Sequence, residues 1–424
     1  MRWPERTGTL PNRLFRAFPI ILLALAGTFV LNRLGFLTGL EHYALDTEMA
    51  AAPRASADLR IVDISDADYD DLFGGRSPLD VAKLQELIGA IALSNPAVIG
   101  VDIDTSHPQF KSFAIDPKWP PIIWERELSS LDATGANGML PLDVLGGQNP
   151  GLNADSGVPA LLDDPDDKVT RLYTKCISSK AGPLRSFVDA IATPFVAARS
   201  SHTAPGSATP AEIAAAFRDA ATNPASKSSC VGAANDDEQA RFIKFSLRPV
   251  DVDLRSASQV IGLSGLPDAQ GGGQAIPDLA GKIVLLGGSY RDFDRHFTPI
   301  GEETGMMILA NAVQTELDGG GPTANSRSVT FLLEVTASLL FVTALQRLSP
   351  SPARLLLQGV ALVALISLGF SFFAFHSFSR VGNFLPTLFA VLVFEVYEHI
   401  RHESLRHAAK GAPEAPLIAP GDDT

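Results

Sequence analysis

The sequence predicts an α/β domain, built on a mostly parallel sheet with flanking helices, together with an α-helical membrane bundle of four transmembrane helices. Short runs rich in Ile, Val and Leu alternate with a segment of helical periodicity, which is the order expected of parallel strands joined by crossover helices. Four apolar segments flank that region, one before it and three after it. The composition, 46% hydrophobic and 19% charged, agrees with such a mixture.

The four apolar segments are about as long as a bilayer is thick, which takes roughly 20 residues. Short loops rich in Arg and Lys stay on the cytoplasmic side, and Arg347 and Arg354 border the link between the second and third segments. We therefore expect a multi-pass protein of the cell inner membrane, with both ends inside and the large domain in the periplasm. A cleaved signal peptide is the less favoured alternative for the first segment, because no small-residue cleavage site follows it closely.

This expectation divides the chain into seven parts. They are a cytoplasmic N-terminus (1–16), a first transmembrane helix (17–37), an extracytoplasmic domain (41–325), three further transmembrane helices (328–346, 355–376 and 382–400) and a short cytoplasmic tail (401–424).

The front of the large domain reads as a βαβ unit. Residues 59–64 and 97–103 are apolar runs typical of buried strands. Between them, residues 78–93 place Val81 and Ile88 on one face at helical spacing. A strand, a helix and a strand within so short a stretch imply two parallel strands.

The end of the domain repeats this pattern once. Residues 282–286 form a third apolar run closed by two glycines, and a helix is predicted over residues 304–317. We expect the run to join the same sheet and the helix to pack on its face. The region between is less regular, with helices predicted at 186–198 and 211–220 and a strand at 241–247.

The charge of the large domain limits its partners. Residues 41–327 hold 39 acidic and 23 basic side chains. Nucleic-acid binding needs clustered Lys and Arg, so nucleic acid is excluded as a partner. The acidity is explained either by solubility or by a cationic ligand.

Acidic residues follow the predicted strands at the edge where parallel sheets bind ligands. Asp102 and Asp104 follow the second strand, Asp294 follows the third, and Asp63 ends the first. These carboxylates predict a pocket for a cation or an amine. The alternative is that they cap helices and line loops, with a nearby arginine such as Arg76 relieving their repulsion.

Motifs for catalysis and metal binding are not found. The sequence has no P-loop, no G-x-S-x-G elbow, no H-E-x-x-H pair and no Cys/His cluster with metal-ligand spacing. We therefore expect no catalytic residues, no cofactor and no metal. The two cysteines, Cys176 and Cys230, could form a disulfide in an oxidising compartment, or could stay unpaired.

The closing part of the domain resembles the CHASE2 family. The matching segments are G-K-I-V-L-L-G-G (281–288), F-T-P (297–299) and G-M-M-I-L-A-N-A (305–312), and Arg171 with the acids before it resembles a D-x-D-x-x-x-R segment of the family. Leu309 stands where many members have His. The resemblance implies an extracytoplasmic sensory domain of a bacterial membrane receptor, and it favours Asp102 and Asp294 as site residues.

We expect a membrane-bound sensor without enzymatic activity. Members of the family usually end in a cytoplasmic kinase, cyclase or phosphodiesterase domain, which residues 401–424 are too short to supply. The expected partners are the membrane, an unknown extracytoplasmic ligand and a separate effector protein, with a homodimer as an open possibility. The alternatives are an envelope structural or assembly scaffold and an enzyme whose motif is not recognised.

Overall fold

The computed structural model describes the chain in segments that fall into two compact units. One unit comprises Met1–Leu45 with Ala324–Thr424, and the other comprises Asp46–Thr323. We call the first the helical unit and the second the α/β unit. The described residues are 10–34, 38–51, 58–130, 139–142, 154–164, 166–179, 182–200, 208–222, 240–248, 254–264, 274–292, 294–324, 327–348, 366, 369, 371–375, 380–381 and 385–411.

The α/β unit is organised around a six-stranded sheet in which every pair of neighbouring strands is parallel. In order across the sheet, the strands are β12 (Leu254–Ser256), β1 (Leu59–Ile64), β13 (Ile283–Gly288), β2 (Val98–Asp102), β3 (Ile122–Glu125) and β6 (Ala154–Gly157). The last of these strands in the chain, β13, is inserted between the first two, β1 and β2. The carboxyl ends of segments distant in sequence therefore meet at one edge.

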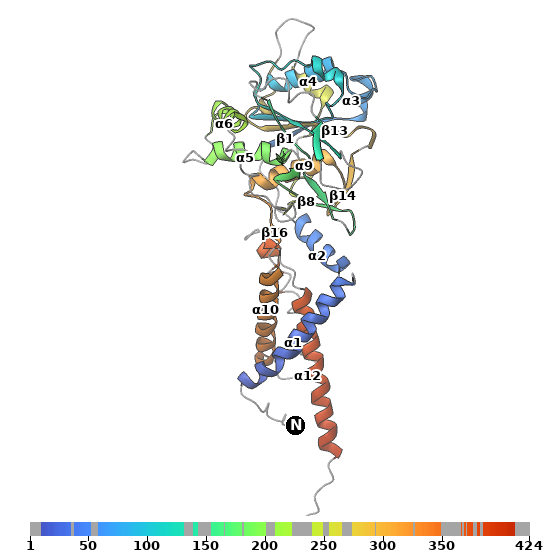
Figure 1. The fold of residues 1–424 in the computed structure, drawn as a ribbon, viewed down its shortest axis with the longest axis vertical. Helices are drawn as coiled ribbons and strands as arrows, with labels where there is room; N and C mark the ends of the chain where they lie inside the picture. The colour runs from blue at the N-terminus through green and yellow to red at the C-terminus, as the bar shows by residue number, and fades with distance from the viewer. Residues whose placement is uncertain are drawn as a thin grey trace, which may run out of the picture. The chain divides into compact units, whose positions relative to one another are not determined.

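Helices cover both faces of this sheet (Figure 1). One face carries α4 (Val81–Ala92) and α8 (Ala257–Ser264), and the opposite face carries α5 (Phe187–Ser200) and α9 (Gly305–Leu317). A further helix, α6 (Pro210–Thr222), packs against α5. The sheet thus lies between two helical layers, as a parallel sheet requires.

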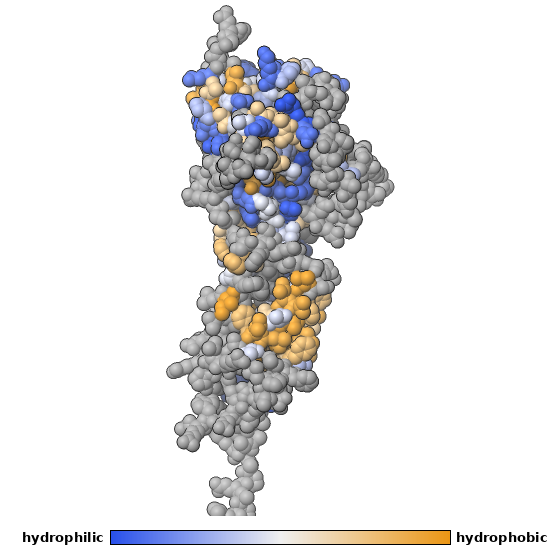
Figure 2. All heavy atoms as spheres, turned by 90° about the vertical axis from the view of Figure 1, so that its left-hand side faces the viewer, coloured by the Kyte–Doolittle hydropathy of each residue, from blue (hydrophilic) through white to orange (hydrophobic). Residues whose placement is uncertain are grey.

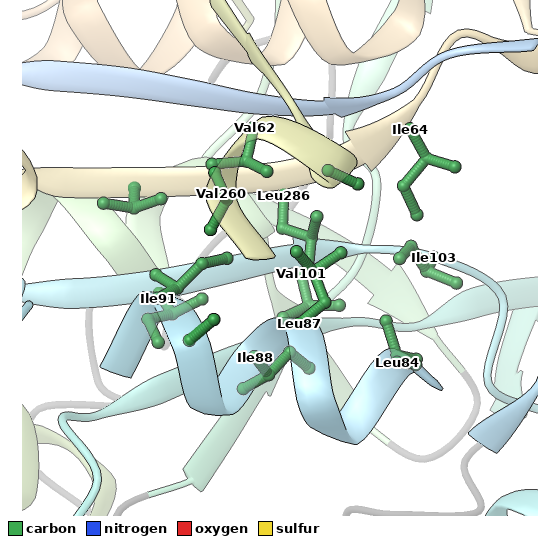
Figure 3. Close-up of a cluster of buried hydrophobic side chains, with 14 of the residues drawn as sticks. Val62, Ile64, Leu84, Leu87, Ile88, Ile91, Val101, Ile103, Val260 and Leu286 are labelled. Atoms are coloured by element: carbon green, nitrogen blue, oxygen red, sulfur yellow. The ribbon is translucent and has the colours of Figure 1, made fainter. Parts of the chain in front are cut away.

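The main apolar core lies between α4, α8 and the sheet (Figure 3). Leu84, Leu87 and Ile91 project from α4 toward Val101 and Leu286 of the central strands. All five side chains are fully buried, and each contributes about 1.5–3 kcal/mol by leaving water. This packing holds α4 against the central strands and so fixes the position of the carboxyl ends of these strands.

Smaller antiparallel pairs and short helices complete the α/β unit. β8 (Thr170–Tyr173) lies between β7 (Leu161–Asp163) and β11 (Arg241–Phe242). Three hairpins join β4 (Glu127–Ser130) to β5 (Met139–Leu142), β9 (Cys176–Ser179) to β10 (Gly182–Arg185) and β14 (Arg295–Thr298) to β15 (Gly301–Thr304). The remaining elements are α3 (Asp66–Asp71) and the 3-10 turns Pro108–Ser112, Pro277–Leu279 and Tyr290–Asp292, and the boundary between the two units falls within α2 (Thr38–Ala50), whose residues from Asp46 onward belong to the α/β unit.

The helical unit packs α1 (Leu10–Arg33), α10 (Arg327–Leu348) and α12 (Leu385–Gly411) around a small apolar core. Two short strands, β16 (Thr323–Ala324) and β17 (Arg380–Val381), are also described. Large apolar side chains such as Leu332 and Leu340 are exposed on α10. Figure 2 shows this hydrophobic surface on the helical unit and a largely hydrophilic surface on the α/β unit.

The structure corrects the predicted membrane bundle. Among the described residues, no helix combines the length and the apolar character needed to cross a membrane. The predicted transmembrane helices at 17–37, 328–346 and 382–400 are therefore wrong, and most of the predicted helix at 355–376 lies outside the described residues. The predicted multi-pass location in the inner membrane is wrong for the same reason.

The α/β part of the fold agrees with the prediction, with one exception among the elements. β1, α4, β2, β13 and α9 lie where the apolar runs and the helical periodicity placed them. The predicted strand at 241–247 is wrong beyond Phe242, because residues 243–247 instead form an extended segment against α9. Three strands of the sheet, β3, β6 and β12, were not predicted at all.

Candidate functional site

The candidate site is the edge of the sheet where β1, β13, β2 and β3 end. In open parallel sheets, ligands bind beyond these carboxyl ends. Asp102 is the last residue of β2 and Glu125 is the last residue of β3. The neighbouring strands β2 and β3 pair through Val101 and Trp124, so the two acids leave the sheet side by side.

Asp102 is a partly buried acid whose nearest charged groups are also acids. Its carboxyl group hydrogen-bonds to Glu125, and it faces the negative charge of Asp294. Burial raises the pKa of Asp102 above its ordinary range, the charge of Asp294 raises it further, and the hydrogen bond to Glu125 opposes both. The site therefore favours either a proton or a cation at Asp102.

Asp294 is held over the first turn of α9. Its carbonyl oxygen accepts a hydrogen bond of 2.9 Å from the N–H of Gly305, and the Thr304 hydroxyl caps the helix by accepting from the Met307 N–H at 3.4 Å. A Cβ atom at position 305 would lie 1.9 Å from Asp294 Oδ2, so only glycine permits this approach. The positive end of the helix dipole stabilises a carboxylate at this place.

His296 supplies a cation to Asp294 from the hairpin that follows it. The His296 Nε2 atom lies 2.9 Å from Asp294 Oδ1. This hydrogen bond raises the pKa of His296 above its ordinary value, against the lowering effect of burial, and the charges of Asp294 and Asp163 raise it further. Asp294 is thus shared between Asp102, which repels it, and His296, which attracts it.

In the described part of the chain, the other two predicted site residues, Asp104 and Arg76, form no hydrogen bond or ion pair with Asp102 or Asp294. Asp104 is exposed and accepts a hydrogen bond of 2.8 Å from the Ser106 N–H, as the alternative loop role predicts. Arg76 is exposed in the turn before α4, and it forms no ion pair with the described acids of this edge. Burial, followed by the charges of Tyr69, Asp104 and Asp102, raises the pKa of Tyr290, so this ring lies beside the acids.

A different arginine, Arg291, forms hydrogen bonds with the acids that follow β1. Arg291 adopts a left-handed backbone with φ of 64°, and its N–H donates a hydrogen bond of 2.7 Å to Asp66. Its guanidinium group donates to Asp70 at 2.8 Å and lies 5.3 Å from the centre of the Tyr69 ring. These acids are therefore neutralised locally, whereas Asp102 is not.

Arg171, singled out by the resemblance, is almost completely buried on β8. Its guanidinium group donates paired hydrogen bonds to Asp46 on α2, at 2.6 and 2.9 Å, and to Asp167, both at 2.8 Å. Asp164 adds a longer contact at 3.4 Å. Two bidentate pairs on one arginine form a rigid link between α2 and the β7–β8 turn. The residue serves as a structural clamp here.

A second buried network lies at the far end of α9. Glu316 accepts a hydrogen bond of 2.6 Å from the Tyr173 hydroxyl and pairs with Lys175 at 2.7 Å and Arg241 at 3.3 Å. Lys175 also reaches Asp189 at 3.6 Å. Burial, and then the charge of Glu316, raises the pKa of Tyr173, which keeps its hydroxyl protonated as a donor. Every acid in this network has a cationic partner.

The structure describes only one of the two cysteines of the predicted disulfide. Cys176 is disulfide-bonded, and its side chain is buried at the start of β9. Cys230 lies outside the described residues, so the pairing of the two stays a prediction.

The chain matches a known protein family over most of its length. A model of the CHASE2 domain matches residues 20–347. The chain belongs to the CHASE2 domain family. CHASE2 domains are extracellular sensory domains, and a sensor role is consistent with the match. No curated protein and no solved structure gives a significant match.

Sequence reasoning predicted Asp102 and Asp294 but missed Glu125 and His296. Glu125 follows the apolar run Ile122–Trp124, which is the same pattern of a strand and then an acid that marked Asp102. His296 carried no signal in the sequence, although it lies only two residues after its partner, Asp294. Among the described residues, no three acids or histidines of this edge approach one another as closely as metal ligands do.

Proposed function

We propose that this CHASE2 protein is a sensor without enzymatic activity, whose ligand is a small organic cation bound at the carboxyl edge of the sheet. The observation that carries the proposal is the meeting of Asp102 and Asp294, which lie almost two hundred positions apart in sequence yet interact electrostatically. The charge of Asp294 raises the pKa of Asp102, so a cation bound between these two carboxylates would relieve their repulsion.

The spacing of the acids at this edge favours an ammonium group over a metal ion as the ligand. The acids do not converge tightly enough for metal ligation, but carboxylates spaced more widely can each accept an N–H hydrogen bond from one ligand. Glycine at positions 287 and 305 allows β13, Asp294 and α9 to pack closely at this edge, because a Cβ at 287 would lie 2.0 Å from the Met306 Cε atom.

We also propose that the bound state is passed to a separate effector protein. The CHASE2 match ends at residue 347, and the described residues beyond it belong mainly to α12. The last turns of this helix are polar, with an ion pair of 3.3 Å between Arg401 and Glu398. A polar helical surface of this kind suits reversible contact with another protein.

The experiment is a thermal-shift screen of the purified full chain against small amines, from methylammonium and tetramethylammonium to the diamine putrescine. We expect at least one amine to raise the melting temperature and to do so less than half as strongly with Asp102→Asn or Asp294→Asn. Glu86→Gln is the matched control, because Glu86 lies on α4 across the sheet and pairs with Lys83 at 2.9 Å. Equal amine effects in all variants would contradict a ligand site at this edge.

A further inference from the structure

The β14–β15 hairpin is attached to the candidate site at both of its ends. It begins directly after Asp294 and ends at Thr304, the residue that caps α9. Between these ends only Thr298 is buried, and the Phe297 side chain is 65% exposed. Elements with little buried surface open at a low free-energy cost. The hairpin is therefore the part of this edge that moves most easily.

The first strand of the hairpin leads to the Arg171 clamp. Phe297 of β14 forms a parallel β-bridge with Val169, two residues before Arg171. Arg171 in turn holds Asp46 on α2 through two hydrogen bonds. A displacement of β14 would thus act on the backbone beside the residue that clamps α2.

The second strand of the hairpin leads to the same helix by another route. Glu303 on β15 lies opposite His296, and burial raises its pKa, while the charges of Arg248 and Arg295 oppose this rise. Arg248 donates a hydrogen bond of 2.9 Å to the carbonyl oxygen of Ala50, the last residue of α2. The first strand is thus linked to α2 at Asp46 through direct contacts, and the second at Ala50 through the attraction between Glu303 and Arg248.

By contrast, α9 is held too firmly to move by itself. Residues 305–316 are all buried. The Asn311 side chain accepts from the Leu247 N–H at 2.8 Å and donates to the Leu247 carbonyl at 3.2 Å, and the Thr315 hydroxyl accepts from the Lys244 N–H at 2.9 Å. Shifting α9 would break this core, whereas shifting the hairpin would not.

We propose that the β14–β15 hairpin is the moving part of the sensor, that His296 holds it to Asp294 while the site is empty, and that a cationic ligand displaces His296 and so loosens the end of α2. The ligand in this inference rests on the proposed function, but the contact between the hairpin and α2 does not. This mechanism needs a single step: the ammonium group of the ligand replaces the imidazolium group of His296 at Asp294.

This exchange makes ligand binding depend on pH. Glu303 lies opposite His296 on the neighbouring strand, and the charges that raise the pKa of His296 are those of Asp294, which accepts its hydrogen bond, and Asp163 on β7. Both favour the protonated ring, and the pKa of His296 lies above its ordinary value. Protonation and ligand binding then oppose each other, and by linkage the ligand lowers the pKa of His296 as much as protonation weakens the ligand.

Hydrogen exchange of the full chain tests the coupling without any ligand. We expect His296→Gln to speed exchange in residues 295–304 by about tenfold, as for the loss of a hydrogen bond between charged groups. Exchange in residues 46–50 should rise with it, while β2 and β13 stay unchanged. Glu302→Gln is the matched control, since it removes an exposed charge from the same hairpin. Faster exchange in the hairpin without any change in residues 46–50 would overturn the coupling to α2.

Putrescine, as the probe, tests the displacement in the wild-type chain. Adding it should lower the pKa of His296 measured by NMR, and its affinity should rise with pH, but not with His296→Gln. Binding at Asp102 and Asp294 that leaves the pKa of His296 unchanged would refute the displacement while keeping the proposed function. Absence of binding by every amine would refute the proposed ligand class, and the exchange experiment would still decide whether the hairpin and α2 are coupled.

Discussion

The two ends of α9 carry acidic residues in opposite situations. At its C-terminal end, Glu316 is paired with Lys175 and Arg241, and the neighbouring Asp189 is paired with Arg185 at 2.7 Å. At its N-terminal end, the acids around Asp102 have one another and a titratable histidine as partners. The first group is complete and holds the fold together. The second group places acids beside one another, which is expected of a site that binds a ligand.

Breaking the complete network should have the largest effect. Asp189 is only 1% exposed, and replacing it with Ala leaves Arg185 without its acid and removes the longer contact to Lys175, which should destabilise the α/β unit by about 3–5 kcal/mol. Urea unfolding followed by tryptophan fluorescence measures this, because Trp119 and Trp124 both belong to the α/β unit.

The matched control is an exposed ion pair of the same unit. Asp70→Ala breaks the pair with Arg291, whose side chains are about half exposed, and should change stability by less than about 1 kcal/mol. Similar losses for Asp189→Ala and Asp70→Ala would show that the buried network has no special role in holding the fold.

Reduction of the disulfide should have the next largest effect on stability, and it too concerns the network at the C-terminal end of α9. Cys176 directly follows Lys175, and a bond to Cys230 would close a loop of about 55 residues, with roughly 4 kcal/mol of stabilisation from chain entropy. We expect neither thiol to react with a labelling reagent before reduction, and the unfolding midpoint to fall after it. Labelling of both cysteines in unreduced, unfolded protein would rule out the bond.

The smallest effect, and one of opposite sign, is expected at Asp102. Because its folded pKa is raised, its stabilising contribution is complete at pH values below the unfolded pKa and is lost as pH rises through the folded pKa. Asp102→Asn removes a charge that the neutral-pH fold disfavours, so the melting temperature at pH 7 should rise by roughly 2–4 °C. The gain should shrink as pH falls toward the ordinary Asp pKa of 3.8, because the wild-type carboxyl group then takes up a proton.

Melting curves of the full chain between pH 4 and pH 8 check this prediction, with Glu86→Gln as the control. The control should show no pH-dependent gain, because Glu86 is paired with Lys83 on the surface of α4. A clear fall in melting temperature for Asp102→Asn at pH 7 would mean that Asp102 is structural and would weaken the ligand hypothesis.

The sequence by itself determined the elements that depend on local patterns. Apolar runs bounded by polar residues predicted β1, β2 and β13, because strands buried on both faces need uninterrupted apolar residues. Helical spacing predicted α4, and the acid at the end of β2 predicted where a ligand site would lie. The resemblance to CHASE2 domains came from the same closing segment, β13 to α9, and the family match agrees with it.

The tertiary structure decided everything that joins distant residues. No local pattern places β13 between β1 and β2, because the order of parallel strands depends on how whole helices pack on the sheet. That order brings Asp102 beside Glu125 and Asp294, and Arg171 beside Asp46. Pairing of charges, and hence the difference between the two ends of α9, arises only when the chain has folded.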